Sequence, residues 1–232
     1  MRNGDTKSSL NFGLFSPSTL ALFYFSFFTL LLLTGVISYV KDIPIGHFTR
    51  DTTAVVGAPF YVGSISKIGI LLWCTTAAMC LLTSAVLHKT SAGSRRTSFL
   101  LGGGLVTSVL LLDDFFLIHE EIAPLHLAVP SDVVLASYGA LALAFVLYYR
   151  DCILQSNYPL LVLSIVFLVG SVGLDLLHDK AVLSFLTTPQ GIQYLLEDGF
   201  KLLGIAGWLS YFGSECYLAL VHQSRSAATS PR

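Results

Sequence analysis

The sequence has little charge: only 12% of its 232 residues are Asp, Glu, Lys or Arg. Soluble domains carry about 25% of these residues, so the shortage argues against a soluble globular fold. The formal net charge of −1 also provides no excess of basic residues to bind a nucleic-acid backbone. We therefore expect no nucleic-acid partner.

Cysteine is scarce as well, and no two of the four cysteines form a CxxC pair. This spacing predicts neither a zinc ribbon nor a disulfide framework. All four lie in or beside apolar runs, where cysteine acts as a small apolar residue. They are Cys74, Cys80, Cys152 and Cys216.

Long apolar runs are what the sequence has in abundance, with 54% hydrophobic residues overall. A helix needs about 20 apolar residues to cross a bilayer. We therefore predict an all-α integral membrane bundle of about six transmembrane helices, at residues 18–40, 60–88, 98–118, 133–149, 158–177 and 195–221. The first run exceeds the roughly 7–15 apolar residues of a signal peptide, so we expect it to be retained. The prediction is one membrane domain, 18–222, between flexible tails 1–17 and 223–232.

The distribution of Lys and Arg predicts the orientation, because basic residues concentrate on the cytoplasmic side. With the N-terminus inside, the outer loops hold only Lys41, Arg50 and Lys180. The inner segments hold Arg2, Lys7, Lys89, Arg95, Arg96, Arg150, Arg225 and Arg232. We expect both termini in the cytoplasm and the chain in the plasma (inner) membrane.

Acidic residues collect at the opposite, outer side. The third and fifth predicted spans end there and the sixth begins there, so three motifs meet at one depth. Asp113 and Asp114 lie within an apolar run, where a carboxylate is costly unless it is paired or neutralised. For the more terminal Glu120, Glu121, Asp132 and Asp179, ordinary solvated helix ends are the simpler interpretation.

Helical spacing suggests which of these groups share a face. Asp113 and Glu120 are seven residues apart and lie on one side of a continuous helix, whereas His119 points elsewhere unless the helix unwinds. Asp175 and His178 are three residues apart and adjacent on the fifth span.

One use of such a layer is a metal site. Carboxylates and neutral histidine suit zinc, manganese or iron. A metal with an open position would activate water, which would make the protein a metal-dependent membrane lipid hydrolase. No HExxH motif or pair of ExxH motifs is present. The candidate ligands are Asp113, Asp114, His119, Asp175, His178 and Glu197.

Two other uses stay open. Carboxylates at membrane depth serve as relay groups, which would make this a proton-coupled carrier. Alternatively, Asp113 and Asp114 pair with Lys67 and Lys201 across helices in a structural or assembly protein. Lys201 also has the spacing to pair on its own helix with Glu197 or Asp198. Membrane lipid is the expected partner in each case, and whether the chain forms a homo- or hetero-oligomer stays open.

Three stretches resemble those of a widespread group of bacterial multipass membrane proteins of unknown activity. They are residues 66–73 (SKIGILLW), 112–120 (LDDFFLIHE) and 197–208 (EDGFKLLGIAGW). The resemblance covers most of the chain from about residue 60 onward. It implies a six-helix membrane protein and no known reaction.

A weaker similarity is to the superfamily of alkaline ceramidases and progestin-receptor-like proteins. That superfamily binds zinc through an early Ser-x-x-x-His, an Asp on the next helix and a late His-x-x-x-His. Ser84 and His88 match the first motif and Asp113 or Asp114 the second. The late histidine pair is missing, and Ser84 and His88 fall at the inner end of the predicted bundle.

Overall fold

The structure, a computed structural model, describes residues 17–90, 94–179 and 192–229. Within those ranges all regular structure is helical and no strand occurs, in agreement with the all-α fold expected from the sequence. The chain divides into two compact units, Met1–Val62 and Gly63–Arg232, which we describe separately.

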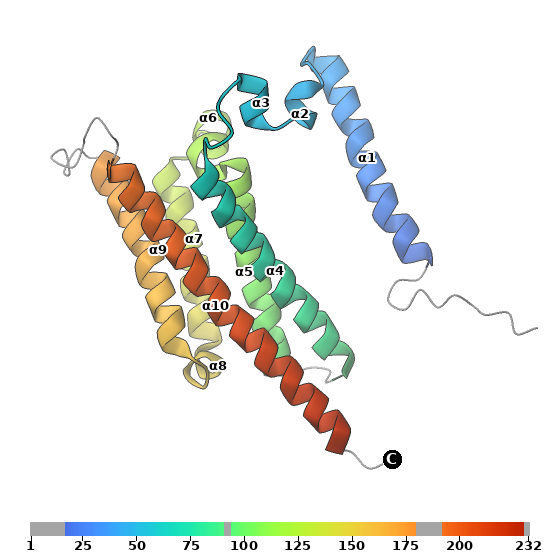
Figure 1. The fold of residues 1–232 in the computed structure, drawn as a ribbon, viewed down its shortest axis with the longest axis vertical. Helices are drawn as coiled ribbons and strands as arrows, with labels where there is room; N and C mark the ends of the chain where they lie inside the picture. Colours follow the sequence, from blue (N-terminus) through green and yellow to red (C-terminus); the bar gives the residue numbers. More distant parts are fainter. Residues whose placement is uncertain (1–16, 91–93, 180–191, 230–232) are drawn as a thin grey trace, which may run out of the picture. The chain divides into compact units, whose positions relative to one another are not determined.

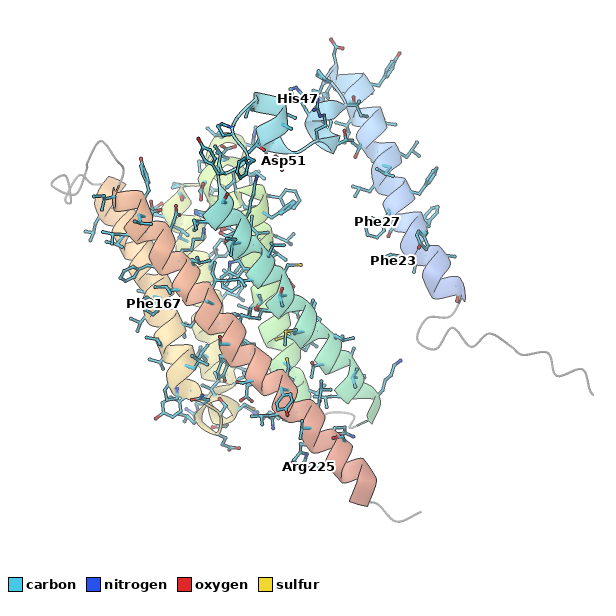
Figure 2. The ribbon with its side chains drawn as sticks, viewed as in Figure 1. Phe23, Phe27, His47, Asp51, Phe167 and Arg225 are labelled. Atoms are coloured by element: carbon cyan, nitrogen blue, oxygen red, sulfur yellow. The ribbon has the colours of Figure 1, made fainter. Side chains whose placement is uncertain are left out.

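The first unit contains one long helix and two short ones. In α1 (Pro17–Lys41), none of the residues from Ala21 onward is buried. The rings of Phe23 and Phe27 contact each other at 4.9 Å between centroids (Figure 2). The predicted outer loop that follows folds into α2 (Gly46–Thr49) and α3 (Thr52–Val56). Such a uniformly apolar, exposed helix is suited to a lipid environment.

The second unit contains the other predicted spans as helices, with connecting turns. They are α4 (Ser64–Thr90), α5 (Arg95–Phe116), the π-helix η1 (Ile118–Ile122), α6 (Ala123–His126), α7 (Ser131–Tyr148), α8 (Arg150–Leu154), α9 (Tyr158–Asp179) and α10 (Ile192–Thr229). In the described part of the chain, five helices are long and apolar enough to cross a membrane: α1, α4, α5, α7 and α9. α10 is long but more polar, and falls outside that set.

α10 organises the second unit, because it packs against α9, α4 and α5 (Figure 1). Aromatic rings fill the space between these helices. Phe99 of α5 is fully buried and stacks on Phe145 of α7 at 5.6 Å and on Phe212 of α10 at 5.8 Å between centroids. Trp73 and Trp208 make an edge-on contact between α4 and α10 at 6.0 Å.

Glycine allows α9 and α10 to approach closely. A Cβ atom at Gly204 would lie 2.7 Å from the Leu168 side chain and 3.0 Å from its backbone nitrogen. Ser164, one turn before Leu168, donates a hydrogen bond of 2.7 Å to the Gly204 carbonyl. Small residues at a helix interface bring two backbones together in this way within a membrane.

Candidate functional site

The site forms where α5 ends, at Phe116 rather than at residue 118 as predicted. Leu117 adopts a left-handed conformation (φ 53°), and its N–H bonds to the Asp113 carbonyl. The π-helix Ile118–Ile122 follows directly. A left-handed leucine is uncommon, and it persists only where surrounding contacts hold it in place. This break turns the next residues back toward α5.

Asp113 is the centre of one hydrogen-bond network. Its Oδ2 lies 2.5 Å from Nδ1 of His119, and its Oδ1 accepts bonds from the His119 backbone N–H (3.0 Å) and the Tyr138 hydroxyl (2.9 Å). The carboxylate is 4% exposed. A continuous helix would have turned His119 away, so the break at Leu117 brings the two side chains together.

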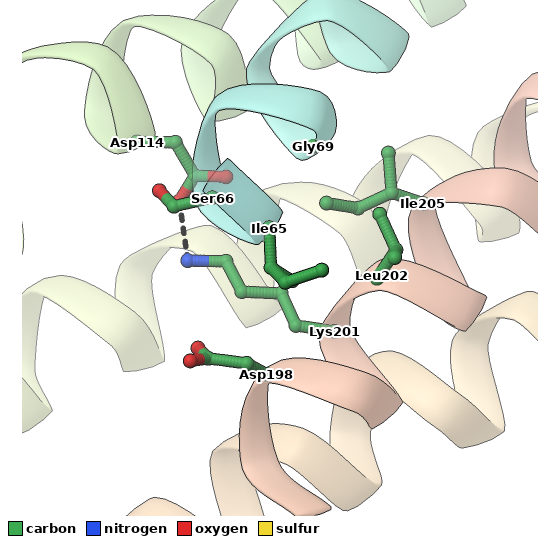
Figure 3. A pocket seen from close by; sticks show the side chains of 8 residues that line it. All are labelled: Ile65, Ser66, Gly69, Asp114, Asp198, Lys201, Leu202 and Ile205. Atoms are coloured by element: carbon green, nitrogen blue, oxygen red, sulfur yellow. Dashed lines mark ion pairs between the residues drawn. The ribbon is translucent and has the colours of Figure 1, made fainter. Parts of the chain in front are cut away.

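Asp114 is the centre of a second network that joins three helices. Its Oδ1 lies 2.7 Å from Nζ of Lys201 on α10 (Figure 3). Its Oδ2 accepts a 2.9 Å bond from the indole N–H of Trp73 on α4. The sequence left two kinds of partner open for Lys201, an aspartate across helices or an acidic residue on its own helix. The structure shows the pair across helices, with Asp114. A pair this shielded from solvent interacts more strongly than an exposed pair.

A small pocket opens beside this ion pair. Figure 3 shows Asp198 on the far side of the Lys201 ammonium from Asp114, and Ser66 next to the pair. Ile65, Gly69, Leu202 and Ile205 supply the apolar walls. The space suits about one water molecule that would bond to the remaining ammonium protons.

The three acidic motifs do converge around this point. Glu197 on α10 lies within electrostatic range of Asp175 on α9, of Asp198, and of Glu120 in the π-helix. Lys67 lies in the first turn of α4, next to the pocket residue Ser66. The cluster at this end of the bundle therefore draws its charges from α5, the π-helix, α9 and α10.

The predicted metal site is not visible in the described part of the chain. Among residues 17–90, 94–179 and 192–229, no three His, Cys, Asp or Glu side chains come together to hold a metal. The side chain of His178 lies outside what the structure describes. Metal ligation by Asp113, Asp114, His119, Asp175, His178 and Glu197 stays a prediction.

His119 lies outside the candidate spans and has an unusual charge environment. Burial by itself lowers the pKa of His119, but the hydrogen bond and charge of Asp113, with the charge of Glu120, outweigh that effect. The pKa of His119 is therefore raised above its ordinary value. Its Nε2 lies 3.6 Å from Oε1 of Glu120, which is exposed.

A separate polar layer closes the opposite end of the bundle. Arg96 of α5 pairs with the buried Glu215 of α10 at 3.1 Å. Arg95 donates a 2.7 Å bond to the Tyr148 carbonyl at the end of α7. The partner of neither arginine was predictable from the sequence, since nothing in the spacing indicates which helices become neighbours.

Helices of bilayer length, an aromatic core and ion-paired layers at both ends define a helical membrane protein. Residues 24–214 match the domain of unknown function DUF8692, and the chain belongs to that family. It matches no curated protein and no solved structure.

Proposed function

We propose that this chain is a six-span membrane protein whose outer-end cluster assembles and orders the bundle. The observation that supports this role is that all four carboxylate oxygens of Asp113 and Asp114 have partners within the protein. These partners satisfy both carboxylates within the protein, so neither needs a bound ion to be stable at this position.

The ion pair supports α10 as the sixth span. Lys201 and Asp114 would each be costly at the membrane edge alone, and pairing offsets much of that cost. Trp73 adds a bond from a third helix to the same carboxylate. The arrangement favours one register of α4, α5 and α10, which is the best-attested use of buried polar groups in helical assemblies.

The proposed topology has both termini in the cytoplasm and the Asp113–Asp114 end outside. The distribution of Lys and Arg supports it, since basic residues concentrate in the segments that this topology places inside. The plasma (inner) membrane of a bacterium is the location that this proposal implies.

A double-mutant cycle tests the assembly role. Asp114→Asn and Lys201→Met each leave one charge of this half-buried pair without its partner, which should lower the unfolding free energy by about 1–3 kcal/mol. The double variant should recover much of that loss. Thermal unfolding of the detergent-purified protein measures all three. Asp198→Asn is the matched control, because Asp198 lines the same pocket but is exposed and forms no ion pair with a described residue. It should change stability by less than about 0.5 kcal/mol. Simple additivity of the two single effects would argue against the proposal.

Elemental analysis separates this role from the metal-dependent hydrolase. The assembly role predicts no stoichiometric zinc, manganese or iron in the purified protein. A near-stoichiometric metal that is lost in His178→Ala would contradict it and restore the metal site.

A further inference from the structure

Two exposed arginines meet at one carboxylate where α5 begins and α7 ends. Nη2 of Arg95 lies 3.7 Å from Oδ2 of Asp151, and Nε of Arg150, the first residue of α8, lies 3.6 Å from Oδ1 of the same carboxylate. Both distances are too long for a hydrogen bond, so Asp151 occupies no N–H donor of either guanidinium. Two positive charges against one negative charge leave this cluster with an excess of positive charge.

Tyr148, the last residue of α7, holds Arg95 in place. Its carbonyl accepts the 2.7 Å bond from Nη2 of Arg95, and the centroid of its ring lies 5.5 Å from the guanidinium carbon. A cation over an aromatic face at this distance is attracted to the ring. The hydroxyl of Tyr149 donates a 2.9 Å bond to the Ser98 carbonyl, which ties the same end of α7 to α5. The guanidinium of Arg95 is therefore positioned in advance, although its side chain is 54% exposed.

Arg96 shows that arginines at this end of the bundle differ in their surroundings. It pairs at 3.1 Å with the buried Glu215, which neutralises its charge within the bundle. Among the residues that the structure describes, Asp151 is the one carboxylate that pairs with Arg95 and Arg150. The first two residues of α5 thus have separate roles, Arg96 in the packing of α10 and Arg95 at the surface.

The cluster lies at the edge of the apolar layer. The candidate span Arg95–Phe116 begins here and the candidate span Ser131–Tyr148 ends here. Leu147 and Leu101, on the apolar side of the cluster, are 60% and 44% exposed. Tyrosine and arginine are typical of headgroup depth, where their apolar parts face the acyl chains and their polar ends face water. A phosphate bound between the two guanidiniums at this depth would therefore belong to a lipid.

We propose that Arg95 and Arg150 bind the phosphodiester of an anionic phospholipid. The planar N–H donors of a guanidinium match the oxygens of a phosphate group. The excess of positive charge favours a lipid of net negative charge, such as phosphatidylglycerol, over zwitterionic phosphatidylcholine. This site rests on the proposed membrane topology, which places it in the cytoplasmic leaflet, where anionic lipids attract basic residues.

Native mass spectrometry of the detergent-purified full chain tests the proposal. The protein is titrated with phosphatidylglycerol or with phosphatidylcholine of the same acyl chains, and the bound fractions give the two dissociation constants. The native chain should prefer phosphatidylglycerol. Arg150→Gln should weaken phosphatidylglycerol binding about fivefold, the effect of one basic residue near an anionic lipid surface. Arg95→Gln combined with Arg150→Gln should abolish the preference.

Arg150→Gln is the deciding variant, because its side chain is 73% exposed and its removal leaves the bonds of Arg95 to Tyr148 in place. Asp151→Asn removes the carboxylate that competes with the phosphate, so this variant should bind phosphatidylglycerol more tightly than the native chain. Weaker binding in Asp151→Asn would contradict the proposed role of the two guanidiniums.

Lys89→Gln is the matched control, since Lys89 is an exposed basic residue of α4 at the same end of the bundle. It should bind phosphatidylglycerol as the native chain does. Equal weakening in Lys89→Gln and Arg150→Gln would show diffuse attraction in place of a site, and equal affinity of the native chain for both lipids would also overturn the proposal. Displacement of the lipid by millimolar inorganic phosphate would assign the arginines to a soluble anion.

Failure of this proposal is distinguishable from failure of the proposed assembly role. Binding in detergent does not depend on the orientation of the chain in a membrane. The Asp114–Lys201 cycle would also be unaffected, because the two sites share no residue.

Discussion

Asp113 and Asp114 are neighbours in the chain but belong to different networks. Asp113 orders the turn after α5 through His119 and Tyr138, whereas Asp114 joins α5 to α4 and α10. Adjacent residues on a helix point about 100° apart, so one pair of carboxylates can serve two interfaces. Replacement of Asp113 should therefore affect the turn, and replacement of Asp114 the packing of α10.

The raised pKa of His119 makes the stability of this turn depend on pH. A histidine whose pKa is higher in the folded state stabilises that state below its unfolded pKa of about 6.5, and this contribution is lost as pH rises through the folded pKa. We expect the melting temperature to fall as pH rises across that window. His119→Gln should remove that part of the dependence, as thermal unfolding from pH 5 to 9 would measure.

His126 provides the control for this effect. It lies close by in α6 and is exposed. The melting temperature of His126→Gln should depend on pH in the same way as that of the native chain. An unchanged profile in His119→Gln would show that the dependence has another source.

The sequence identified the two aspartates and one of their partners, Lys201, but not the others. Asp113, Asp114 and Lys201 are recognisable because charges in apolar runs are rare. Trp73 and Tyr138 were not singled out, because an aromatic residue in an apolar run looks the same whether it faces lipid or donates a bond to a carboxylate. The contact between His119 and Asp113 depends on the left-handed Leu117, for which no glycine or asparagine gave a signal.

At the scale of helices, close packing of α9 on α10 depends on glycine. Gly204→Ala places a methyl group 2.7 Å from the Leu168 side chain and 3.0 Å from its backbone, which leaves little room to adjust. Overpacking of this kind costs about 1–3 kcal/mol. Chemical or thermal unfolding in detergent would measure the loss.

Gly199 on the same helix is the matched control. A Cβ atom there meets nothing within 4 Å. Gly199→Ala should be neutral or should stabilise α10 by about 0.5–1 kcal/mol, since alanine is the better helix former. Equal effects at both positions would mean that the α9–α10 contact does not limit stability.

At the scale of the whole molecule, the long helices were predictable because each needs an apolar run of about bilayer length. The helices α1, α4, α5, α7, α9 and α10 begin and end within a few residues of the predicted runs, except that α10 extends to Thr229. Which helices become neighbours was not predictable. Pairing of α9 with α10 and of α4 with α5 depends on side-chain shape, as at Gly204 and Gly104, which hydrophobicity does not reveal.

Labelling of single cysteines would test the proposed topology. In a variant that lacks the four native cysteines, Thr52→Cys lies in the predicted outer loop and Gln155→Cys in an inner turn. Both positions are exposed. A membrane-impermeant maleimide added to intact cells should label the first and spare the second. The reverse pattern would invert the orientation. Labelling of both would contradict the three spans that the proposed topology places between the two positions.

The position of α10 in the chain has a consequence for biosynthesis. α10 is translated after α4, α5 and α9, yet it supplies Lys201 to Asp114 and Glu215 to Arg96. Until it emerges, both charged ends of α5 lack these partners. A nascent chain halted before α10 would therefore present unpaired charges at the ends of α5. Membrane quality control could recognise such charges. The bundle would be complete only when α10, its last described helix, is made.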